Sequence, residues 1–418
     1  MKSISEWTLI TVLPLLLTTC TSPTQENEAS LVTNSSEYIT YGDEVSFMKQ
    51  YTEIVELSEP SGEGRIAVLP ALQGRVMTSS ASGQNGRSYG WINRELFESG
   101  DTLAHINPYG GEERFWLGPE GGQFSIFFEP KSEFNLDNWQ TPELIDLEPF
   151  TVKNQSSGQV VFTKAASLTN YSGFQFDLGI EREVRILSEA DIIKAFGLNN
   201  LDGIQAVAYQ TSNTLTNVGE EDWREETGLL SIWLLGMFNP SPNTTVILPY
   251  ISGSEAELGL PVNDTYFGKV PEERLVIAEK VIYFSGDGKY RSKIGLSPNR
   301  AKNIIGSYDS ANGILTVVKY SKPEGVTKYV NSLWEIQEKP YAGDVVNSYN
   351  DGSAEPGKKP LGPFYELETS SPALALKVGE SGTHEQITCH IEGDEEKLNV
   401  IIKQLFGVSI DEIKNAFE

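Results

Sequence analysis

The feature that most constrains the fold of this chain is a succession of short apolar segments separated by Gly, Asn, Asp and Pro. Short segments of this kind, bounded by residues that favour turns, are typical of β-strands. Many strands with turns between them predict a sandwich or a barrel. We expect strands at residues 65–70, 74–78, 124–128, 159–162, 184–187, 206–211, 229–235, 245–248, 275–284, 313–320 and 374–378.

Helical patterns are few. Residues 189–196 follow Ser188, which is a good N-cap residue, and precede Gly197, a residue type that commonly ends helices. Two amphipathic segments, residues 395–406 and 409–417, stand at the end of the chain. We expect all three to be peripheral elements that cover the edges of a large β core.

The first twenty residues have the pattern of a targeting segment. Lys2 is the only positive charge before an apolar run at residues 7–17, and that run is too short to span a membrane. It ends at Leu17-Thr18-Thr19-Cys20, which resembles the lipobox of bacterial lipoproteins, although the family usually has Gly, Ala or Ser directly before the cysteine.

This resemblance implies a lipoprotein signal peptide at residues 1–19, lipidation of Cys20 and a flexible tether at residues 20–40. The protein is then expected to be exported and held in the cell envelope, at the outer membrane, through a lipid anchor without a spanning helix. The alternative is a plain secretory signal, which also implies export.

The charge balance excludes some partners. The chain has 32 Lys and Arg against 58 Asp and Glu, a net charge of −26, whereas nucleic-acid binding draws on clustered cations. We therefore expect no nucleic-acid partner. Only one cysteine other than Cys20 is present, Cys389, which lies in an alternating run and is expected to be a small core residue.

Histidine is scarce, and no cofactor or metal site is specified by the sequence. His384 and His390 lie about 20 Å apart if they share one strand, too far to bind one metal ion. A calcium ion held by carboxylates and carbonyls would leave no such signature.

Two loops stand out. Residues 342–363 are rich in Gly, Asn, Ser, Lys and Pro, and a loop of this length is usually functional or mobile, so we expect a flap beside a pocket. Residues 286–288, Gly-Asp-Gly, have the composition of a hairpin turn.

Residues 105–122, HINPYGGEERFWLGPEGG, combine two glycine pairs with a charged and aromatic core. The glycines permit backbone angles closed to other residues. Arg114, Trp116 and Glu120 together offer a donor fork, a flat apolar face and a carboxylate, which suit a pyranose. The alternative is structural: Arg114 pairs with Glu112, Glu113 or Glu120 while the glycines only make turns.

A second candidate segment is residues 364–371, FYELETSS. Glu366 and Glu368 are two apart, so on a strand they share one face, with about 6 to 7 Å between their Cα atoms. That separation is near the one found in glycoside hydrolases. One of the two glutamates can equally pair with Arg114 in a structural network.

These segments, in their order, carry a resemblance to a known family. Residues 108–122 resemble the glycine-pair segment of the galactose-mutarotase-like superfamily, which holds aldose 1-epimerases and hexose-phosphate epimerases. Residues 213–219, followed by Trp223 and by 228–233, and residues 367–369, followed by 373–381, resemble further segments of that superfamily. The likeness is closest to mutarotase-like lipoproteins of Bacteroidetes.

The resemblance covers residues 41–393 and implies an all-β fold. We expect a large two-sheet antiparallel β-sandwich, the galactose-mutarotase-like supersandwich, with a sugar-binding groove on one concave face and a few peripheral helices. Residues 394–418 would form a C-terminal helical extension.

The resemblance also implies site residues. Glu368 matches the epimerase base, which takes the proton of the anomeric hydroxyl while an acid protonates the ring oxygen, and no cofactor is needed. The position matching the family's acid histidine holds Ser231, a poor acid, so His105 is our candidate acid; the alternative is that His105 caps the turn before Asn107-Pro108. The expected substrate-binding residues are Arg114, Trp116, Glu120, Asn213, Asn217, Trp233 and Glu366.

The sequence therefore predicts an exported carbohydrate-binding protein and leaves its activity open. One hypothesis is an aldose 1-epimerase-like isomerase that uses Glu368 and His105. Its rival is a non-catalytic glycan-binding lipoprotein of the same fold, favoured by the absence of a histidine near Ser231. A glycoside hydrolase using Glu366 and Glu368 is the third alternative.

Overall fold

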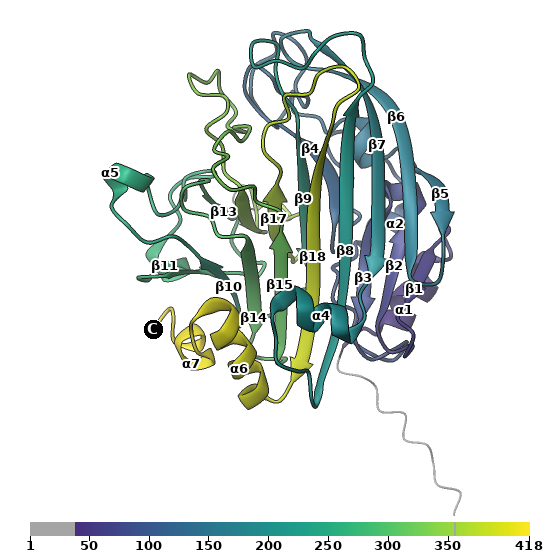
Figure 1. Ribbon diagram of the computed structural model, residues 1–418, viewed down its shortest axis with the longest axis vertical. Coiled ribbons are helices and arrows are strands. Elements are labelled where there is room, and N and C mark those ends of the chain that lie inside the picture. Colours follow the sequence, from purple (N-terminus) through teal and green to yellow (C-terminus); the bar gives the residue numbers. More distant parts are fainter. Residues whose placement is uncertain (1–37, 355–356) are drawn as a thin grey trace, which may run out of the picture. The chain divides into compact units, whose positions relative to one another are not determined.

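The computed structural model of the chain describes residues 38–354 and 357–418 (Figure 1). Residues 38–418 form one compact unit. The expected signal peptide, the lipidated Cys20 and most of the expected tether lie outside the described residues. Within the described part of the chain, no helix is long and apolar enough to cross a membrane.

Most of the unit is antiparallel β-structure in three sheets. The largest has ten strands in the spatial order β11-β12-β10-β14-β15-β18-β8-β7-β6-β5. In chain order they are β5 (Thr151–Gln155), β6 (Gln159–Thr169), β7 (Gln175–Ile186), β8 (Ile204–Asn217), β10 (Thr244–Pro249), β11 (Leu275–Ile277), β12 (Val281–Ser285), β14 (Ile304–Asp309), β15 (Ile314–Tyr320) and β18 (Ser381–Gly393).

The second sheet has five strands in the order β13-β16-β17-β9-β4. These are β4 (Arg114–Gly118), β9 (Ser231–Phe238), β13 (Ser292–Leu296), β16 (Val346–Asn350) and β17 (Tyr365–Ser370). A three-stranded sheet contains β1 (Val55–Ser58), β2 (Arg65–Leu69) and β3 (Arg75–Ser80), and a single bridge between Val76 and Glu113 joins β3 to the residue before β4.

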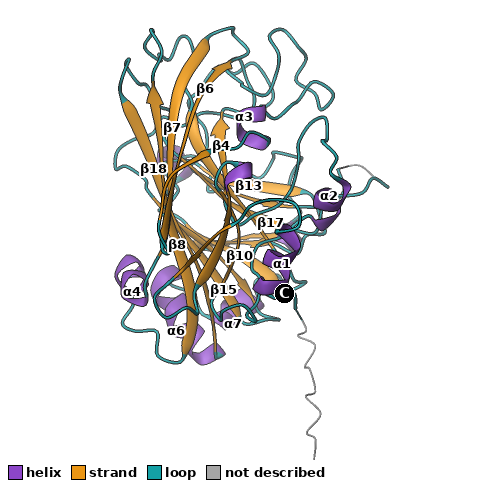
Figure 2. Cartoon of the chain, turned by 90° about the vertical axis from the view of Figure 1, so that its right-hand side faces the viewer, coloured by secondary structure: helices purple, strands orange, loops and turns teal. Residues whose placement is uncertain are grey.

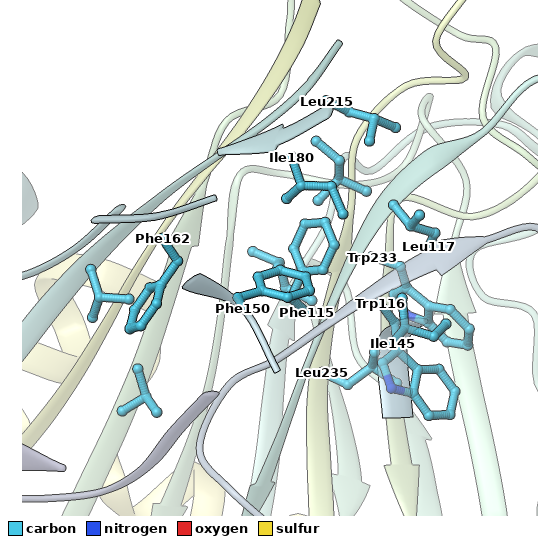
Figure 3. Packing of buried hydrophobic residues seen from close by; sticks show 14 of the residues in the cluster. Phe115, Trp116, Leu117, Ile145, Phe150, Phe162, Ile180, Leu215, Trp233 and Leu235 are labelled. Atoms are coloured by element: carbon cyan, nitrogen blue, oxygen red, sulfur yellow. The ribbon is translucent and has the colours of Figure 1, made fainter. Parts of the chain in front are cut away.

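The ten-stranded and five-stranded sheets face each other, and their inner faces form the core. Figure 2 shows β7, β8 and β18 on one side of this arrangement and β4, β13 and β17 on the other. Phe115 of β4 packs in one cluster with Phe162 of β6 and Ile180 of β7 (Figure 3). Leu234 of β9 belongs to the same cluster, and all four side chains are at most 3% exposed. Burial of such apolar surface is the main force that holds the two sheets together.

The helices are short and peripheral, as expected. α4 (Glu189–Phe196) has Ser188 as its N-cap and Gly197, with φ 66°, directly after it. α6 (Glu395–Phe406) and α7 (Ile410–Lys414) follow β18 and pack their apolar sides against the ten-stranded sheet (Figure 1). The others are α1 (Tyr41–Met48), α2 (Arg94–Ser99), α3 (Glu143–Asp146), α5 (Glu255–Leu258), and the 3-10 turns η1 (Pro70–Leu72) and η2 (Glu272–Arg274).

The expected fold class, a large antiparallel two-sheet β-sandwich with a few peripheral helices, is confirmed. Most expected strands are present, but residues 124–128 are irregular and residues 374–378 make a single bridge through Leu374. In the first case Phe127 and Phe128 are buried among aromatic side chains of loops, so their apolar character does not reflect a sheet. Residues 275–284 are divided into β11 and β12, which pair with each other.

One loop prediction was wrong, and another was correct only in part. Residues 286–288 do not close a hairpin, because β12 belongs to the ten-stranded sheet and β13 to the five-stranded sheet. The expected flap, residues 342–363, does border a pocket, but it contains β16, an inner strand of the five-stranded sheet. The polar residues of β16 hid it from a search for apolar runs, because Asn347, Ser348 and Asn350 are buried with hydrogen-bonded side chains.

Candidate functional site

The outer face of the five-stranded sheet gathers the residues of the candidate site. Residues paired across antiparallel strands point to the same face. Arg114 pairs with Leu235, Trp116 with Trp233, and Leu235 with Glu368. Glu366 shares this face because it lies two residues before Glu368, as the sequence predicted. The intervening residues Phe115, Leu234 and Leu367 point to the core.

Loops cover this face and leave a pocket of two adjoining lobes, which we name the polar lobe (about 320 Å³) and the apolar lobe (about 390 Å³). The loop before β11 contributes to both lobes, and the segment before β16 supplies much of the polar lobe. Residues after β16 line the apolar lobe. The residues common to both lobes are Glu120, Leu136, Trp233, Phe267, Arg291, Lys293 and Trp334.

Glu368 is paired with a lysine that the sequence analysis did not identify. Its Oε2 accepts hydrogen bonds from Lys293 Nζ at 2.8 Å and from Trp233 Nε1 at 3.0 Å, while its Oε1 has no partner among the described residues. Glu368 is 0% exposed and lines neither lobe, whereas Lys293 and Trp233 line both. The expected base therefore lies beneath these two side chains.

The surroundings of Lys293 favour the protonated form of its side chain. Burial lowers its pKa, but the negative charges of Glu368 and Glu120 outweigh burial and hold the pKa above its usual value. Its Nζ also lies 4.8 Å from the Trp233 ring centroid, within the range of a cation–π contact. Glu120 lines both lobes, and burial together with repulsion from Glu368 raises its pKa despite the opposing charge of Lys293.

Glu366 is the member of the glutamate pair that lines the pocket, in the apolar lobe. Its Oε1 lies 2.5 Å from Nη2 of Arg114, whose guanidinium stacks on Trp116 at 4.8 Å. Burial raises the pKa of Glu366 to about 8, and the charge of Glu368 adds to this effect, while Arg114 opposes it. The pairing of Arg114 with a glutamate is thus confirmed, with Glu366 as the partner instead of Glu112, Glu113 or Glu120.

The polar lobe contains a further carboxylate that sequence reasoning missed. Asp344 accepts a hydrogen bond of 2.6 Å from the Tyr266 hydroxyl and one of 3.3 Å from Asn263 Nδ2. Asn347 Nδ2 donates to the Tyr266 hydroxyl at 3.1 Å. Burial raises the pKa of Asp344. Ser231, which the sequence resemblance aligned with an epimerase acid, also lines this lobe, and its hydroxyl has no partner among the described residues.

His105 lines the apolar lobe with Glu366. Its Nδ1 lies 2.7 Å from the carbonyl oxygen of Trp139. In the neutral tautomer that fits this contact, Nδ1 donates and Nε2 is an acceptor, so the ring can act as an acid only when it is protonated. The His105 ring thus contacts Trp139 and not Asn107. The Asn107 side chain has other partners, Asp146 and the carbonyl of Leu103.

Two other predicted residues lie elsewhere. Asn213 is fully buried between the sheets, where it bonds to Arg182, Thr211 and the carbonyl of His384. Asn217 holds the end of β8 by donating to the carbonyls of Glu221 and Leu376. Neither side chain lines the polar or the apolar lobe.

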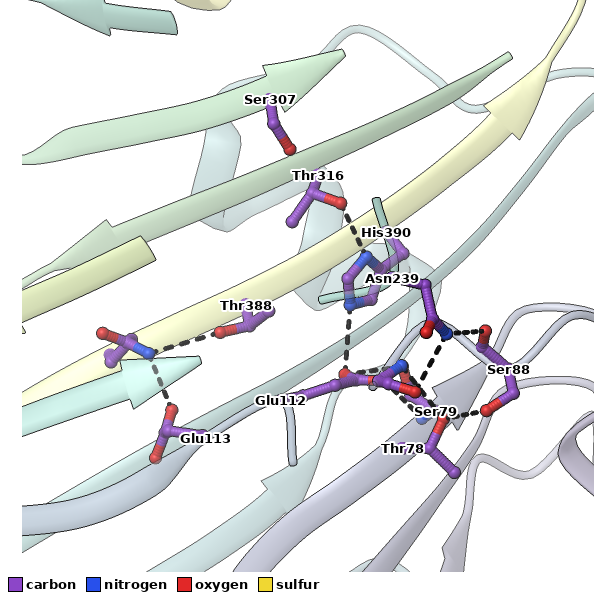
Figure 4. Close-up of polar contacts among 12 residues, drawn as sticks. Thr78, Ser79, Ser88, Glu112, Glu113, Asn239, Ser307, Thr316, Thr388 and His390 are labelled. Atoms are coloured by element: carbon purple, nitrogen blue, oxygen red, sulfur yellow. Dashed lines mark hydrogen bonds and ion pairs between the residues drawn. The ribbon is translucent and has the colours of Figure 1, made fainter. Parts of the chain in front are cut away.

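A second polar cluster, which includes Glu112, Glu113 and His390, lies inside the sandwich (Figure 4). Asn213 adjoins it through Arg182. Glu113 pairs with Arg182 at 2.9 Å and accepts a hydrogen bond of 2.9 Å from Gln386. Glu112 contacts the backbone N–H of Ser79 at 2.5 Å and His390 Nε2 at 3.0 Å. These groups are therefore in contact with one another in the core. In the described part of the chain, no group of three or more His, Cys, Asp or Glu is placed to hold a metal ion.

Solved structures with a similar fold share little sequence with the chain. A candidate aldose 1-epimerase from Escherichia coli K12 is 12% identical with a TM-score of 0.48, covering 82% of this chain and 99% of its own. A galactose mutarotase-like protein from Lactobacillus casei ATCC 334 is 10% identical with a TM-score of 0.47, covering 81% and 100%. A galactose mutarotase related enzyme from Lactobacillus acidophilus is 10% identical with a TM-score of 0.44, covering 82% and 97%.

No curated protein matches the chain significantly. A family model described as "Family of unknown function (DUF6786)" matches residues 39–417.

Proposed function

Because the chain belongs to the DUF6786 family, whose function is unknown, we propose its function from the pocket itself: the protein binds a carbohydrate there. The observation that carries this proposal is a combination of side chains on one face of the five-stranded sheet. Trp116 and Trp233 lie there with two glutamates that each pair with a cation, Glu366 with Arg114 and Glu368 with Lys293. A sugar ring presents C–H groups that pack on aromatic rings and hydroxyls that both donate and accept.

The polar groups of the pocket fit this ligand class. Glu366 and Arg114 offer an acceptor and a donor fork in the apolar lobe. In the polar lobe Asp344 offers an acceptor, and the Tyr266 hydroxyl, which donates to Asp344, holds it in place. Most of these groups already have protein partners, so they are held in fixed positions before the ligand arrives, which lowers the entropic cost of binding.

A second candidate function is aldose 1-epimerase activity, favoured by the different surroundings of the two glutamates. A carboxyl with a pKa of about 8 keeps its proton at neutral pH, so Glu366 can donate to a ring oxygen. Glu368, held by Lys293 and Trp233, would take the proton of the anomeric hydroxyl, after which the ring opens, C1 rotates and the ring recloses. His105 is an alternative acid from the same lobe.

This second function needs a movement. Because Glu368 does not line the pocket, Lys293 has to move away from it before the carboxylate can reach a ligand. Hydrolysis by Glu366 and Glu368 needs both carboxylates beside the scissile bond, and only Glu366 lines a lobe. The geometry therefore supports carbohydrate binding as the function more strongly than it supports epimerisation.

Both functions can be tested in one experiment. The purified protein is mixed with a panel of monosaccharides and oligosaccharides, and saturation-transfer NMR reports binding while exchange spectra report interconversion of anomers. We expect saturation transfer to at least one sugar, and its loss in Trp233→Ala. If the protein is an epimerase, anomer exchange accelerates and Glu368→Gln lowers the acceleration about 100-fold.

The matched control is Glu385→Gln, since Glu385 is an exposed glutamate of β18. It should change neither signal. Binding with no faster exchange leaves a glycan-binding protein, and the absence of binding to every sugar of the panel contradicts the proposal.

We further propose that the protein is exported and anchored by a lipid on Cys20. The support is the apolar run that ends at Leu17-Thr18-Thr19-Cys20. In a bacterial host, the mass of the N-terminal peptide should show a diacylated Cys20, and Cys20→Ala should move the protein from the membrane to the soluble fraction. An unprocessed N-terminus, or cleavage elsewhere, contradicts this proposal.

A further inference from the structure

The pocket contains an arginine that makes no ion pair with a described carboxylate. Arg291 directly precedes β13, and its guanidinium lies over the Phe267 ring at 3.8 Å from the centroid. Its side chain makes no hydrogen bond or ion pair with another described residue. Both residues line both lobes, so the guanidinium stands where the two lobes join.

Each of the other cations of the pocket contacts a carboxyl group of a described residue. Arg114 contacts Glu366 at 2.5 Å, Lys293 contacts Glu368 at 2.8 Å, and Lys359 contacts Glu95 at 2.5 Å. Carboxylates are abundant, because the chain has 58 Asp and Glu against 32 Lys and Arg. Arg65, Arg75 and Arg300 also make no ion pair with a described carboxylate, but of these four arginines Arg291 is the one that lines the pocket.

One carboxylate lies close enough to interact electrostatically with Arg291. The charge of Arg291 opposes the rise in the pKa of Asp351 that burial causes. The oxygens of Asp351, however, accept hydrogen bonds from the Tyr349 hydroxyl at 3.0 Å and from the backbone N–H of Gly362 at 3.0 Å. Asp351 and Arg291 form no ion pair with each other, so the donors of Arg291 stay available to a ligand.

We infer that the carbohydrate bound in this pocket carries an oxyanion group, a carboxylate or a sulfate, and that Arg291 binds it. This inference rests on the proposed carbohydrate binding. A guanidinium presents its N–H donors in a rigid plane that matches two oxygens of such a group, and these charge-assisted hydrogen bonds are stronger than neutral ones. Stacking on Phe267 fixes the plane of the fork in advance. Uronic acids and sulfated sugars are the ligand classes with this chemistry.

The test compares acidic sugars with neutral sugars of the same ring. Binding of galacturonate, galactose 6-sulfate and galactose, together with the glucose equivalents, is measured by NMR titration for the wild-type chain and for Arg291→Gln and Arg291→Lys. We expect at least one acidic sugar to bind about tenfold more tightly than its neutral counterpart. Arg291→Gln should reduce this ratio of affinities to about one, and it should leave the affinity for the neutral sugar within about twofold of the wild-type value.

Two controls separate a direct contact from a change in folding or in general charge. Arg291→Lys keeps the charge without the planar fork and should retain part of the preference. Lys153→Gln removes an exposed cation that is paired with Glu181 and lines neither lobe, and it should leave the ratio unchanged. Thermal unfolding of each variant reports whether the fold is retained.

The outcomes distinguish this inference from the proposed function. Equal affinity for acidic and neutral sugars overturns the inference and leaves carbohydrate binding in place. The inference is also overturned if Arg291→Gln weakens the binding of acidic sugars and of neutral sugars equally. If no sugar binds the wild-type chain, both proposals are wrong. Preference for the uronate over the sulfated sugar, or the reverse, identifies which oxyanion the arginine binds.

Discussion

Glu366 and Glu368 lie two residues apart on one face of β17, and their surroundings differ. Glu368 has a lysine and a tryptophan as donors, whereas Glu366 has one arginine and lines the apolar lobe. Two carboxyl groups in different surroundings can hold different protonation states at one pH, which is the requirement for an acid and a base. At the scale of single residues, the proposed epimerase activity would rest on this asymmetry.

The raised pKa of Glu366 predicts a pH dependence of stability. The pKa is about 8 in the folded protein against a usual value of 4.5, so the folded state binds the proton more tightly than the unfolded state. The stability that this group contributes is fully present below pH 4.5 and is lost as the pH rises through 8. We expect the free energy of unfolding of the wild-type protein to fall more steeply over this range than that of Glu366→Gln.

Urea unfolding at a series of pH values measures this difference. The exposed glutamate Glu225 supplies the control, because Glu225→Gln should leave the pH dependence of the wild type unchanged. Parallel curves for the wild type and Glu366→Gln would show that the carboxyl is ionised throughout, as its contact with Arg114 by itself favours.

The backbone conformation near the start of residues 105–122 depends on Gly110. Its φ is +95°, and a Cβ at this position would lie 2.0 Å from the carbonyl oxygen of Trp91. Gly110→Ala therefore combines a clash with backbone strain and should destabilise the protein by about 3 kcal/mol or more. Chemical denaturation measures the loss.

Gly173 offers a matched control for this substitution. Its φ is +87°, but a Cβ there would meet nothing within 4 Å. Gly173→Ala should cost only about 1 kcal/mol, the strain without the clash. Equal losses at Gly110 and Gly173 would mean that the close approach to Trp91 contributes nothing.

At the scale of elements, α4 shows how local sequence defines a helix. The Ser188 hydroxyl accepts a hydrogen bond from the N–H of Asp191, and the Asp191 carboxylate in turn accepts from the N–H of Ser188, which forms a capping box. Ile192 and Phe196 then face the cluster beneath the helix. The capping groups satisfy N–H groups that would otherwise lack a partner.

The cap predicts the effect of two substitutions. Ser188→Ala should lower the free energy of unfolding by about 1 kcal/mol, because the hydrogen bond to Asp191 is lost. Ser188→Asp should retain stability to within about 0.5 kcal/mol, since aspartate is an equally good N-cap. Urea unfolding measures both, and an equal loss in the two variants would show that the hydroxyl acts in another way.

At the scale of the whole described unit, one buried ion pair connects the sheets. Arg182 comes from β7 of the ten-stranded sheet, and Glu113 directly precedes β4 of the five-stranded sheet. Arg182 also donates a hydrogen bond of 3.0 Å from Nε to the carbonyl of Gly74, next to β3 of the three-stranded sheet. Both charged side chains are 0% exposed, so each depends on the other for compensation of its charge.

Removal of one partner should therefore be costly. We expect Arg182→Met to lower the free energy of unfolding by about 3 to 5 kcal/mol, because Glu113 then remains as a buried charge without its cation. The adjacent pair Lys153–Glu181 has side chains 59% and 51% exposed, and Lys153→Met should cost less than about 1 kcal/mol.

A double-mutant cycle completes this test. Arg182→Met combined with Glu113→Gln should cost less than the sum of the two single substitutions, because the second change removes the charge that the first leaves unpaired. Additive losses in the cycle would contradict the role of the pair as a mutually compensated connection between the sheets.

The sequence by itself determined the features that depend on neighbours along the chain. Short apolar runs identified most strands, the Ser188 and Gly197 signals placed α4, and the spacing of Glu366 and Glu368 put both on one face of β17. Each of these follows from the period of a strand or the end of a helix, which a few adjacent residues define.

Only the tertiary structure decided which distant side chains meet. Lys293 reaches Glu368 because β16 lies between β13 and β17, and β16 was hidden by its buried polar residues. Arg291 directly precedes β13, so the same strand order brings it to the pocket. Asn213 belongs to the interior because the pairing of β7 with β8 places it opposite Arg182. Strand order and register join segments far apart in the chain, and local patterns carry no information about either.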